Sequence, residues 1–595
     1  MDRLHVLSRL RQALPLRSNH HQETIVMKKN IKFYLSSLGA AFVLATTTVS
    51  CSDFLDVEPL NDVVLENYWT KKSDAISVLM GCYESLYSGD CIDRMGLWGE
   101  SRSDNMLLSN VSTSIDLEQF GKENILSTNN FCNWKSFYNA INRCNILIYY
   151  APKVQEMDPN YTLSEMKANV AEATFIRSLC YFHLIRAFRD VPYTTKPSID
   201  DGQNYQVPAD SFNVVLNHLI ADLEAVKEDA QLYFRKPNPD KEQESAERDN
   251  TARVTKPAIY ALLADLYLWQ GDWDKCIACC DYVIDFKKKE YESLRRRLQN
   301  DVYLFNDIPL LMEKVDNVSG HAYEEIFGRG NSFESIFELT FDETLNKDNQ
   351  NSYVGSYYAN YNNNSISNGR LMPFDEFYGN LPSQSTDLFN VKDCRAYECI
   401  YQAGQTQFFI AKYAASRVTI DNSQSNWRPS YSWRSNKYAH WIVYRLTDVM
   451  LMKAEALIQQ GGDHFEDAFT LINAVNKRAV NSFAPGSGEI LKFDDYKESQ
   501  ENMEDLLMEE RQRELMFEGK RWYDLVRQAR RLGSTKKLAA TVTKKQATNQ
   551  GGIRIRLADP NVLYLPYFRN ELKVNPYLKQ NPAYSMGGDA DLSKN

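Results

Sequence analysis

The chain has few histidines and none of the short motifs that identify common enzyme classes. Only 8 of its 595 residues are histidine, and they are scattered. No HExxH, GxSxG, GxGxxG or Walker sequence occurs, which argues against a zinc protease, a serine hydrolase, a dinucleotide-dependent enzyme and a P-loop nucleotidase. We therefore predict no catalytic residues and no cofactor.

An excess of basic residues is also missing. The chain holds 68 Lys and Arg against 78 Asp and Glu, a net charge of −10. The first fifty residues contain seven of those basic and two of those acidic residues, so the remainder has a net charge of −15. Nucleic acids and anionic membrane surfaces both require basic patches. We therefore predict no nucleic-acid partner.

The segment 33–49 near the start is shorter than the roughly 20 predominantly apolar residues that a membrane-spanning helix needs, and serines and threonines dilute it. The uncharged run 33–49 follows three lysines within 28–32 and precedes Ser50 and Cys51. A basic segment, a short apolar segment and a small residue before a cysteine are typical of a lipoprotein signal. We predict a signal peptide over 27–50, with Cys51 as the lipidated first residue of the mature protein.

One position in this signal departs from the usual pattern. Thr48 stands where a leucine normally precedes the lipidated cysteine by three residues, and cleavage without lipid attachment is the alternative. Residues 1–26 have no apolar segment and precede Met27, which fits the start of a signal peptide. We interpret 1–26 as an upstream extension.

Cysteine is present but shows no metal-binding pattern. Cys276, Cys279 and Cys280 are close together, yet no second Cys or His pair follows at zinc spacing, and the segment reads as one helix. We predict small core residues here and no metal. Ten cysteines follow Cys51 in a compartment that permits disulfides, and their spacing leaves the pairing open.

Helical periodicity is the dominant pattern of the chain. Within residues 165–189, Phe175, Leu179, Phe182 and Ile185 follow one another at steps of four, three and three, which places them on one helical face. The Val-Pro dipeptide that follows ends this predicted helix.

Two further segments predict helical hairpins. Pro257 opens a helix that runs through AIYALLADLYLWQGD into a second one, WDKCIACCDYVI. The segment YRLTDVMLMKAEALIQQGGDHFEDAFTLINAVNKRA repeats the scheme around Gly461 and Gly462. In the first hairpin, tetratricopeptide offsets are occupied by Ala264, Tyr267, Gly271, Trp273 and Cys276. We predict a mostly α fold in which two or three irregular hairpins stack into a scaffold.

Residues 342–440 lack helical periodicity and are rich in Asn, Ser, Gly and Tyr. Strand-like pieces occur at 334–341 and 407–413, and long loops dense in aromatics are typical of binding surfaces. The alternative for each ring is that it merely covers the scaffold. From YVGSYYANYNNN and NWRPSYSWRSN, the predicted ligand-binding residues are Tyr353, Tyr357, Tyr358, Tyr361, Trp427, Tyr431 and Trp433.

The late segment ERQRELMFEGKRWYDLVR is densely charged. Read as one helix, it places Glu510 beside Arg513, Arg511 beside Glu514, and Glu518 beside Arg521, each three residues apart. Arginine neighbours hold carboxyl pKa values low, so we predict structural ion pairs and no glycosidase dyad. The predicted buried side of this helix consists of Leu515, Trp522 and Leu525.

Several blocks occur in this order along the chain: CSDFLDVEPLNDVVLENYWTKKSDAISVLMGCYESLY, AEATFIRSLCYFHLIRAFRDVPY, ARVTKPAIYALLADLYLWQGDW, YRLTDVMLMKAEAL, INAVNKRA, EERQRELMFEGKRWYDLVR and YLPYFRNELKVNPYLKQNPAY. Together they resemble the SusD/RagB family of Bacteroidetes surface lipoproteins. One departure is Arg189, where the family usually has glycine. The number and order of the blocks make the resemblance specific.

The resemblance implies a function. SusD-like proteins have a tetratricopeptide-like scaffold with an irregular glycan-binding region, act as a lid over a SusC-like TonB-dependent outer-membrane transporter, and are not enzymes. It adds Trp98 and Asn105 as ligand-facing residues and implies an outer-membrane, cell-surface location through lipidated Cys51. The alternatives are peptide capture, a tetratricopeptide scaffold lipoprotein, and a cell-surface hydrolase.

The implied organisation is one domain over 51–595, with a scaffold over 51–341 and 441–530, a loop-rich ligand region over 342–440 and a C-terminal tail over 531–595.

Overall fold

The structure is a computed structural model of the chain. It describes residues 68–199, 205–315, 317–343, 350–362, 364–378, 386–390, 392–404, 406–421, 428–435, 437–480 and 491–585. All of these belong to one compact unit, Leu65–Asn595. The predicted lipidation site Cys51 and the predicted ligand residue Trp427 lie outside the described residues.

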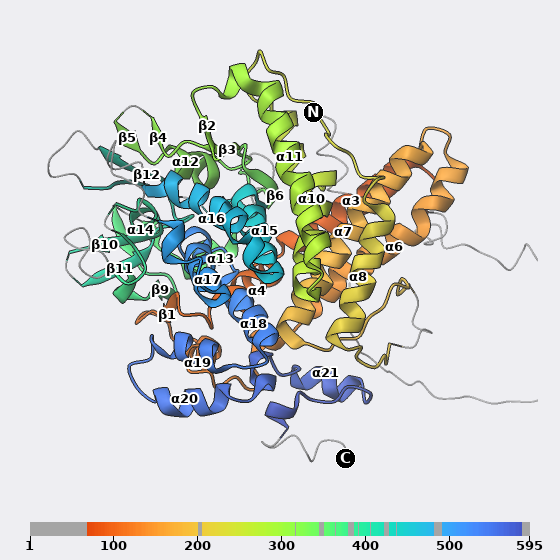
Figure 1. Cartoon of the computed structure of the whole chain (residues 1–595). Coiled ribbons are helices and arrows are strands. Elements are labelled where there is room, and N and C mark those ends of the chain that lie inside the picture. Colours follow the sequence, from red (N-terminus) through yellow and green to blue (C-terminus); the bar gives the residue numbers. More distant parts are fainter. Residues whose placement is uncertain are drawn as a thin grey trace, which may run out of the picture. The chain divides into compact units, whose positions relative to one another are not determined.

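Long helices that pack in succession form the scaffold (Figure 1). Each contacts the next along the series α3, α6, α7, α8, α10, α11 and α15, and α15 also contacts α16 and α17. This is the mostly α, tetratricopeptide-like arrangement that the periodicity predicted. The bounds are α3 (Lys72–Tyr87), α6 (Lys135–Met157), α7 (Leu163–Phe188), α8 (Phe212–Val226), α10 (Lys256–Gln270), α11 (Trp273–Leu298), α15 (Leu446–Gln460), α16 (Phe465–Val480) and α17 (Gln500–Leu515).

Helix α7 confirms the periodicity of its segment. It begins at a capping box in which Thr162 accepts from the backbone N–H of Glu165 and the Glu165 carboxylate accepts from that of Thr162. Its four predicted apolar positions are buried. It ends at Arg189, whose φ of 70° is a conformation that glycine adopts without strain. Ion pairing to Asp190 at 2.8 Å and a 2.6 Å hydrogen bond to Asn561 hold this arginine in place.

The two predicted hairpins are confirmed as α10–α11 and α15–α16. Gly271 ends α10 in the left-handed region at φ 84°, and Gly461 ends α15 at φ 112°. Cys276, Cys279 and Cys280 are buried core residues, as predicted. All ten cysteines of the described part of the chain are buried and unpaired.

Between α11 and α15 the described residues form short strands and short helices in place of long helices. The predicted strand pieces at 334–341 and 407–413 contain β6 and β11. Strand β6 pairs with β14, and a four-stranded sheet has the order β13-β12-β5-β4. The strands are β1 (Met106–Leu108), β2 (Val302–Phe305), β3 (Ile308–Leu311), β4 (Lys314–Val315), β5 (Val318–Ser319), β6 (Ser335–Leu339), β7 (Asn360–Asn362), β8 (Ser365–Ser367), β9 (Leu371–Pro373), β10 (Ile400–Ala403), β11 (Gln407–Ile410), β12 (Ala415–Asp421), β13 (Ser430–Trp433) and β14 (Trp441–Arg445).

The remaining helices are short, and three of them belong to the C-terminal part of the chain. Helices α19, α20 and α21 follow α18 and lie together at the lower edge of Figure 1. The bounds are α4 (Gly89–Glu100), α5 (Ile115–Gly121), α9 (Asp249–Ala252), α12 (His321–Tyr323), α13 (Ser352–Tyr357), α14 (Arg395–Cys399), α18 (Arg521–Leu532), α19 (Lys536–Thr543), α20 (Gln550–Leu557) and α21 (Arg569–Val574).

The prediction of one continuous helix over ERQRELMFEGKRWYDLVR is wrong, because the segment bends between α17 and α18. Phe517 and Gly519 have φ of 66° and 73°, which a helix does not permit. The buried carboxylate of Glu100, at the end of α4, accepts from the backbone N–H of Phe517, Gly519 and Lys520 at 3.0–3.1 Å. These bonds satisfy backbone groups that the bend removes from a helical ladder.

Candidate ligand-binding surface

Three half-buried aromatic rings come together where β13 meets the β10–β11 hairpin. Tyr431 and Trp433 are two residues apart on β13 and therefore share one face of the strand. Their ring centroids are 5.3 Å apart and their planes differ by 14°. Tyr401 of β10 lies edge-on to both, at 4.7 Å from Tyr431 and 5.2 Å from Trp433. These three residues are called the aromatic cluster below.

The cluster is held in place by the strands beneath it. The hydroxyl of Tyr431 donates to the backbone oxygen of Tyr397 at 2.7 Å, and burial raises the pKa of that hydroxyl well above its ordinary value. Strand β13 pairs antiparallel with β12, where Ala415 lies opposite Trp433. A small residue opposite leaves the indole room to lie over the sheet. The cluster is thus a fixed, partly open aromatic surface.

The sequence predicted two members of the cluster and missed Tyr401. On its hairpin, Tyr401 lies opposite Phe409 across the β10–β11 pair, and the turn includes Gly404 at φ 67°. Alternating aromatics around a glycine-containing turn predict a hairpin. The meeting with Trp433, 32 positions later, is a tertiary contact that local pattern does not show.

Five other predicted ligand residues lie in the protein core. Tyr353, Tyr357, Tyr358, Trp98 and Asn105 are at most 2% exposed. Tyr353 packs edge-on against Trp441, the Tyr358 hydroxyl donates to the Phe517 oxygen at 2.6 Å, and the Trp98 indole donates to the Phe131 oxygen at 2.8 Å. A ligand cannot reach these side chains in this structure. Helix α13, which carries Tyr353 and Tyr357, packs against α4. Trp98 packs against Phe137 of α6 and Phe188 of α7, and Asn105 is bonded to Glu100 and Gln512.

Tyr361 lies on the separate two-stranded sheet β7–β8 and is half-buried. Its hydroxyl donates to the Asn364 side-chain oxygen at 3.1 Å. Asn362 and Asn364 beside it are exposed. Of the predicted loop tyrosines within the described residues, Tyr361 and Tyr431 are the two that keep open surface.

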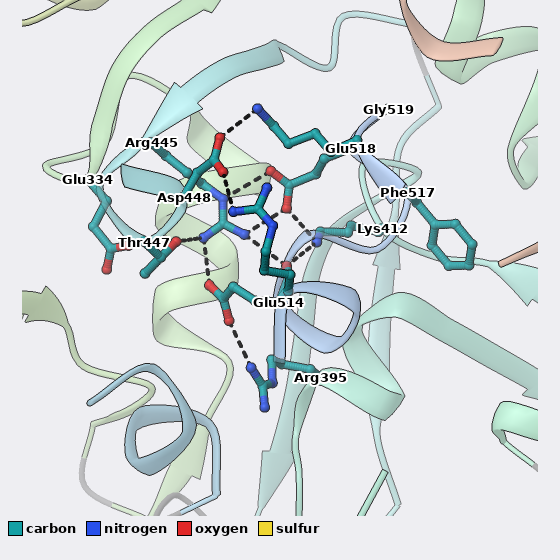
Figure 2. A network of polar contacts seen from close by, with 12 residues as sticks. Glu334, Arg395, Lys412, Arg445, Thr447, Asp448, Glu514, Phe517, Glu518 and Gly519 are labelled. Atoms are coloured by element: carbon teal, nitrogen blue, oxygen red, sulfur yellow. Dashed lines mark hydrogen bonds and ion pairs between the residues drawn. The ribbon is translucent and has the colours of Figure 1, made fainter. Parts of the chain in front are cut away.

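A buried network of charges links α17 to the sheet region (Figure 2). The Glu514 carboxylate is bound by the guanidinium groups of Arg395, Arg445 and Arg478, at 3.0 Å for Arg395 and 2.6 Å for Arg445. Glu518 binds Arg445 and Lys412, each at 2.7 Å. Burial alone would raise the pKa of Glu514, but the three arginines outweigh burial and hold it well below its ordinary value.

Two of the three predicted ion pairs are wrong: Glu518 and Arg521 lie on either side of the bend, and Arg511 and Glu514, although both lie in α17, pair with residues of other segments. The pair Glu510–Arg513 forms at 3.0 Å within α17, as predicted. Arg511 instead pairs with Asp524 of α18 at 2.9 Å, while Arg521 pairs with Asp104 at 2.9 Å. Each carboxylate of this block has a cationic partner in the interior. The network therefore has a structural role, and Leu515, Trp522 and Leu525 are buried as predicted.

One group in the described part of the chain has the spacing of metal ligands. Glu313, Cys394 and Glu398 are buried and place one ligand atom each within 4.8 Å of one another. Burial, followed by the nearby Glu398 carboxyl, raises the pKa of Glu313 well above its ordinary value. Two carboxyls that share a proton account for this arrangement, and the adjoining cavity of about 30 Å³ has room for one water.

Comparisons with known proteins agree with the fold. Residues 333–584 match the model of the SusD family, and residues 53–268 match a second model described as starch-binding associating with outer membrane. The chain belongs to the SusD/RagB family. Helices α15 and α17 and the bend after α17 lie within the residues that the first model matches, and most of α10 lies within the residues that the second one matches.

Relatives of this SusD/RagB chain match over most of its length. SusD-like protein P38 of Formosa agariphila is 24% identical over 557 residues, 90% of this chain and 96% of the relative. The solved structure of a laminarin binding SusD-like protein covers 87% of this chain and all of its own, with 20% identity and a TM-score of 0.58. Surface glycan-binding protein A from Bacteroides thetaiotaomicron, in complex with laminarihexaose, covers 86% at 19% identity and a TM-score of 0.58.

None of the described helices combines the length and the apolar content that a membrane span needs.

Proposed function

We propose that this protein captures oligosaccharide at the cell surface and delivers it to a SusC-like TonB-dependent transporter in the outer membrane. Its SusD/RagB membership supports the proposal, as do the glycan ligands of the two structural relatives. The observation that carries it is the aromatic cluster on β10 and β13. No catalytic step is included, because the carboxylates of the segment ERQRELMFEGKRWYDLVR are buried and paired with cations.

The cluster has the geometry that sugar stacking requires. A sugar ring presents an apolar C–H face, which packs on a flat aromatic surface, and a polar rim. Tyr431 and Trp433 stack on each other, so a sugar would pack on the outer face of this pair, while Tyr401 closes one side. Trp427, three residues before β13, and Tyr361 on its own hairpin are further candidates for the same ligand.

Glycan capture is tested on the soluble protein, expressed from residue 52, with an array of oligosaccharides and polysaccharides. We expect binding to at least one neutral glycan family. Failure to bind any glycan on the array, together with binding to a peptide library, would replace this proposal with peptide capture by the same fold.

The membrane location is tested at Cys51. We expect Cys51→Ala to move the protein from the washed membrane fraction to the soluble fraction, because two acyl chains supply the membrane affinity of a lipoprotein. Retention of Cys51→Ala after washes that remove peripheral proteins would contradict the lipid anchor. The control is Cys82→Ala, which leaves the predicted lipidation site intact.

Delivery implies a stable transporter complex. Extraction of the wild-type protein in mild detergent should recover a large outer-membrane barrel in comparable amount. Recovery of this protein alone in several detergents, with glycan present, would contradict delivery and leave capture standing.

A further inference from the structure

A second binding site is suggested by a cavity of about 550 Å³ beside α11, whose lining includes no residue of the aromatic cluster. Its wall combines the loop 232–257, the C-terminal half of α11 and residues 325–336. Figure 1 shows α11 well separated from β10 and β11. The volume lies within the range of about 300–1,000 Å³ that is usual for small-molecule sites.

Three half-buried aromatic rings line this cavity. Tyr233 comes from the loop, Phe286 from α11 and Phe333 from the segment before β6. The rings of Tyr233 and Phe286 are 5.4 Å apart between centroids, with planes at 39°. The ammonium of Lys287 lies 5.7 Å from the Phe286 ring and 5.1 Å from the Phe333 ring. The cavity thus offers aromatic surfaces from three separate segments.

Buried charged pairs supply the polar part of the wall. Lys287 and Glu290 form a pair at 2.8 Å, with the two residues 5% and 9% exposed. Glu247, 3% exposed, pairs with Arg297 at 3.0 Å. Because these four charges compensate one another, they offer hydrogen-bond donors and acceptors without adding a net charge to the wall.

Asn331, in the segment 325–336, is hydrogen-bonded to two residues of the segment 232–257. Asn331 is buried with φ 50°, and its side-chain oxygen accepts from the Thr251 hydroxyl at 2.6 Å. Its backbone oxygen accepts from the side-chain amide of Gln243, an exposed residue of the loop, at 3.3 Å. These two bonds join the loop to residues 325–336 and hold the cavity open between them.

We propose that this cavity is a second ligand site, which takes a neutral saccharide of one or two sugar units. Aromatic faces suit the C–H faces of a sugar, and compensated carboxylates and ammonium groups suit its hydroxyls. The site is separate from the aromatic cluster and requires no residue of it. It would hold the end of a captured chain or a short product independently of the surface site.

The test uses saturation-transfer NMR with maltose, cellobiose, laminaribiose and xylobiose. The background is the double variant Tyr431→Ala/Trp433→Ala, which removes the surface site. We expect at least one disaccharide to give a transfer signal in this background. Phe286→Ala should weaken that binding roughly three- to tenfold, the contribution of one stacked ring.

A second variant covers the case in which Phe286→Ala does not fold. Gln243→Trp adds volume from the exposed side and should abolish the disaccharide signal, whereas Gln270→Trp, an exposed position at the end of α10, should leave it unchanged. No disaccharide signal in the background, or a signal that Gln243→Trp leaves intact, would overturn the second site. Loss of long-oligosaccharide binding in the background alone concerns the surface site, so the two proposals fail separately.

Discussion

The double variant Tyr431→Ala/Trp433→Ala is expected to lose about ten- to a hundredfold in affinity for its glycan. Each stacked ring contributes on the order of 0.5–1.5 kcal/mol beyond its buried area, so each single change should cost several-fold to about tenfold. The two rings are in contact, and their effects need not add strictly. Isothermal titration calorimetry on the soluble protein, with the glycan identified by array, measures the loss.

The matched control is Tyr431→Phe, which keeps the ring and removes the hydroxyl. That hydroxyl is bonded to the backbone oxygen of Tyr397 beneath the sheet, so Tyr431→Phe should alter stability slightly and affinity very little. Thermal melts of all variants separate loss of binding from loss of folding. Full affinity in the double variant would move the site to another surface, with Tyr361 and Trp427 the next residues to change.

Glu514→Gln is expected to lower the free energy of unfolding by about 3–5 kcal/mol, the cost of breaking a buried ion pair from one side. The substitution keeps the shape of the side chain but leaves Arg395, Arg445 and Arg478 facing a neutral amide. Urea unfolding followed by circular dichroism gives the difference.

The control for this variant is Glu509→Gln on the same helix. The Glu509 side chain is 56% exposed and lies 3.5 Å from Arg513, a surface pair worth about 0–1 kcal/mol. If Glu514→Gln cost no more than Glu509→Gln, the buried network would not stabilise the fold, and the assignment of its structural role would be wrong.

The depressed pKa of Glu514 predicts that the free energy of unfolding depends on pH. The folded pKa of Glu514 is depressed below its unfolded value, so its contribution is present above about pH 4.3 and is lost as pH falls toward the folded pKa. The difference in free energy of unfolding between the wild type and Glu514→Gln should therefore become smaller in acid. An equal difference at pH 7 and pH 3 would contradict a charged Glu514.

The helices could be predicted because their signals are local. In α7 the spacing of Phe175, Leu179, Phe182 and Ile185 requires one buried face whatever lies opposite it. Gly271 and Gly461 end their helices for a reason that belongs to glycine itself, since it adopts positive φ without strain. Family membership was readable for a related reason, because its blocks coincide with these helices and their turns.

The bend after α17 is only partly signalled by its own segment. Glu, Arg, Leu and Met are good helix formers and the block has no proline, while Gly519 permits the positive φ of the bend and Phe517 gives no such signal. The helix stops because Glu100, more than 400 residues earlier, binds the backbone of the bend. Arg511 therefore pairs with Asp524 and Arg521 with Asp104, and neither has the partner predicted along a single helix.

The sequence by itself determined the family, the helical scaffold and the aromatic-rich region in which to look for a binding surface. Only the tertiary structure decided which aromatics remain open. Tyr353 and Tyr431 occur in similar Tyr- and Ser-rich segments, yet α13 carries Tyr353 against α4, while β13 leaves Tyr431 and Trp433 beside the hairpin of Tyr401. Exposure depends on which distant segment packs over a ring, and residue type and local spacing do not specify that contact.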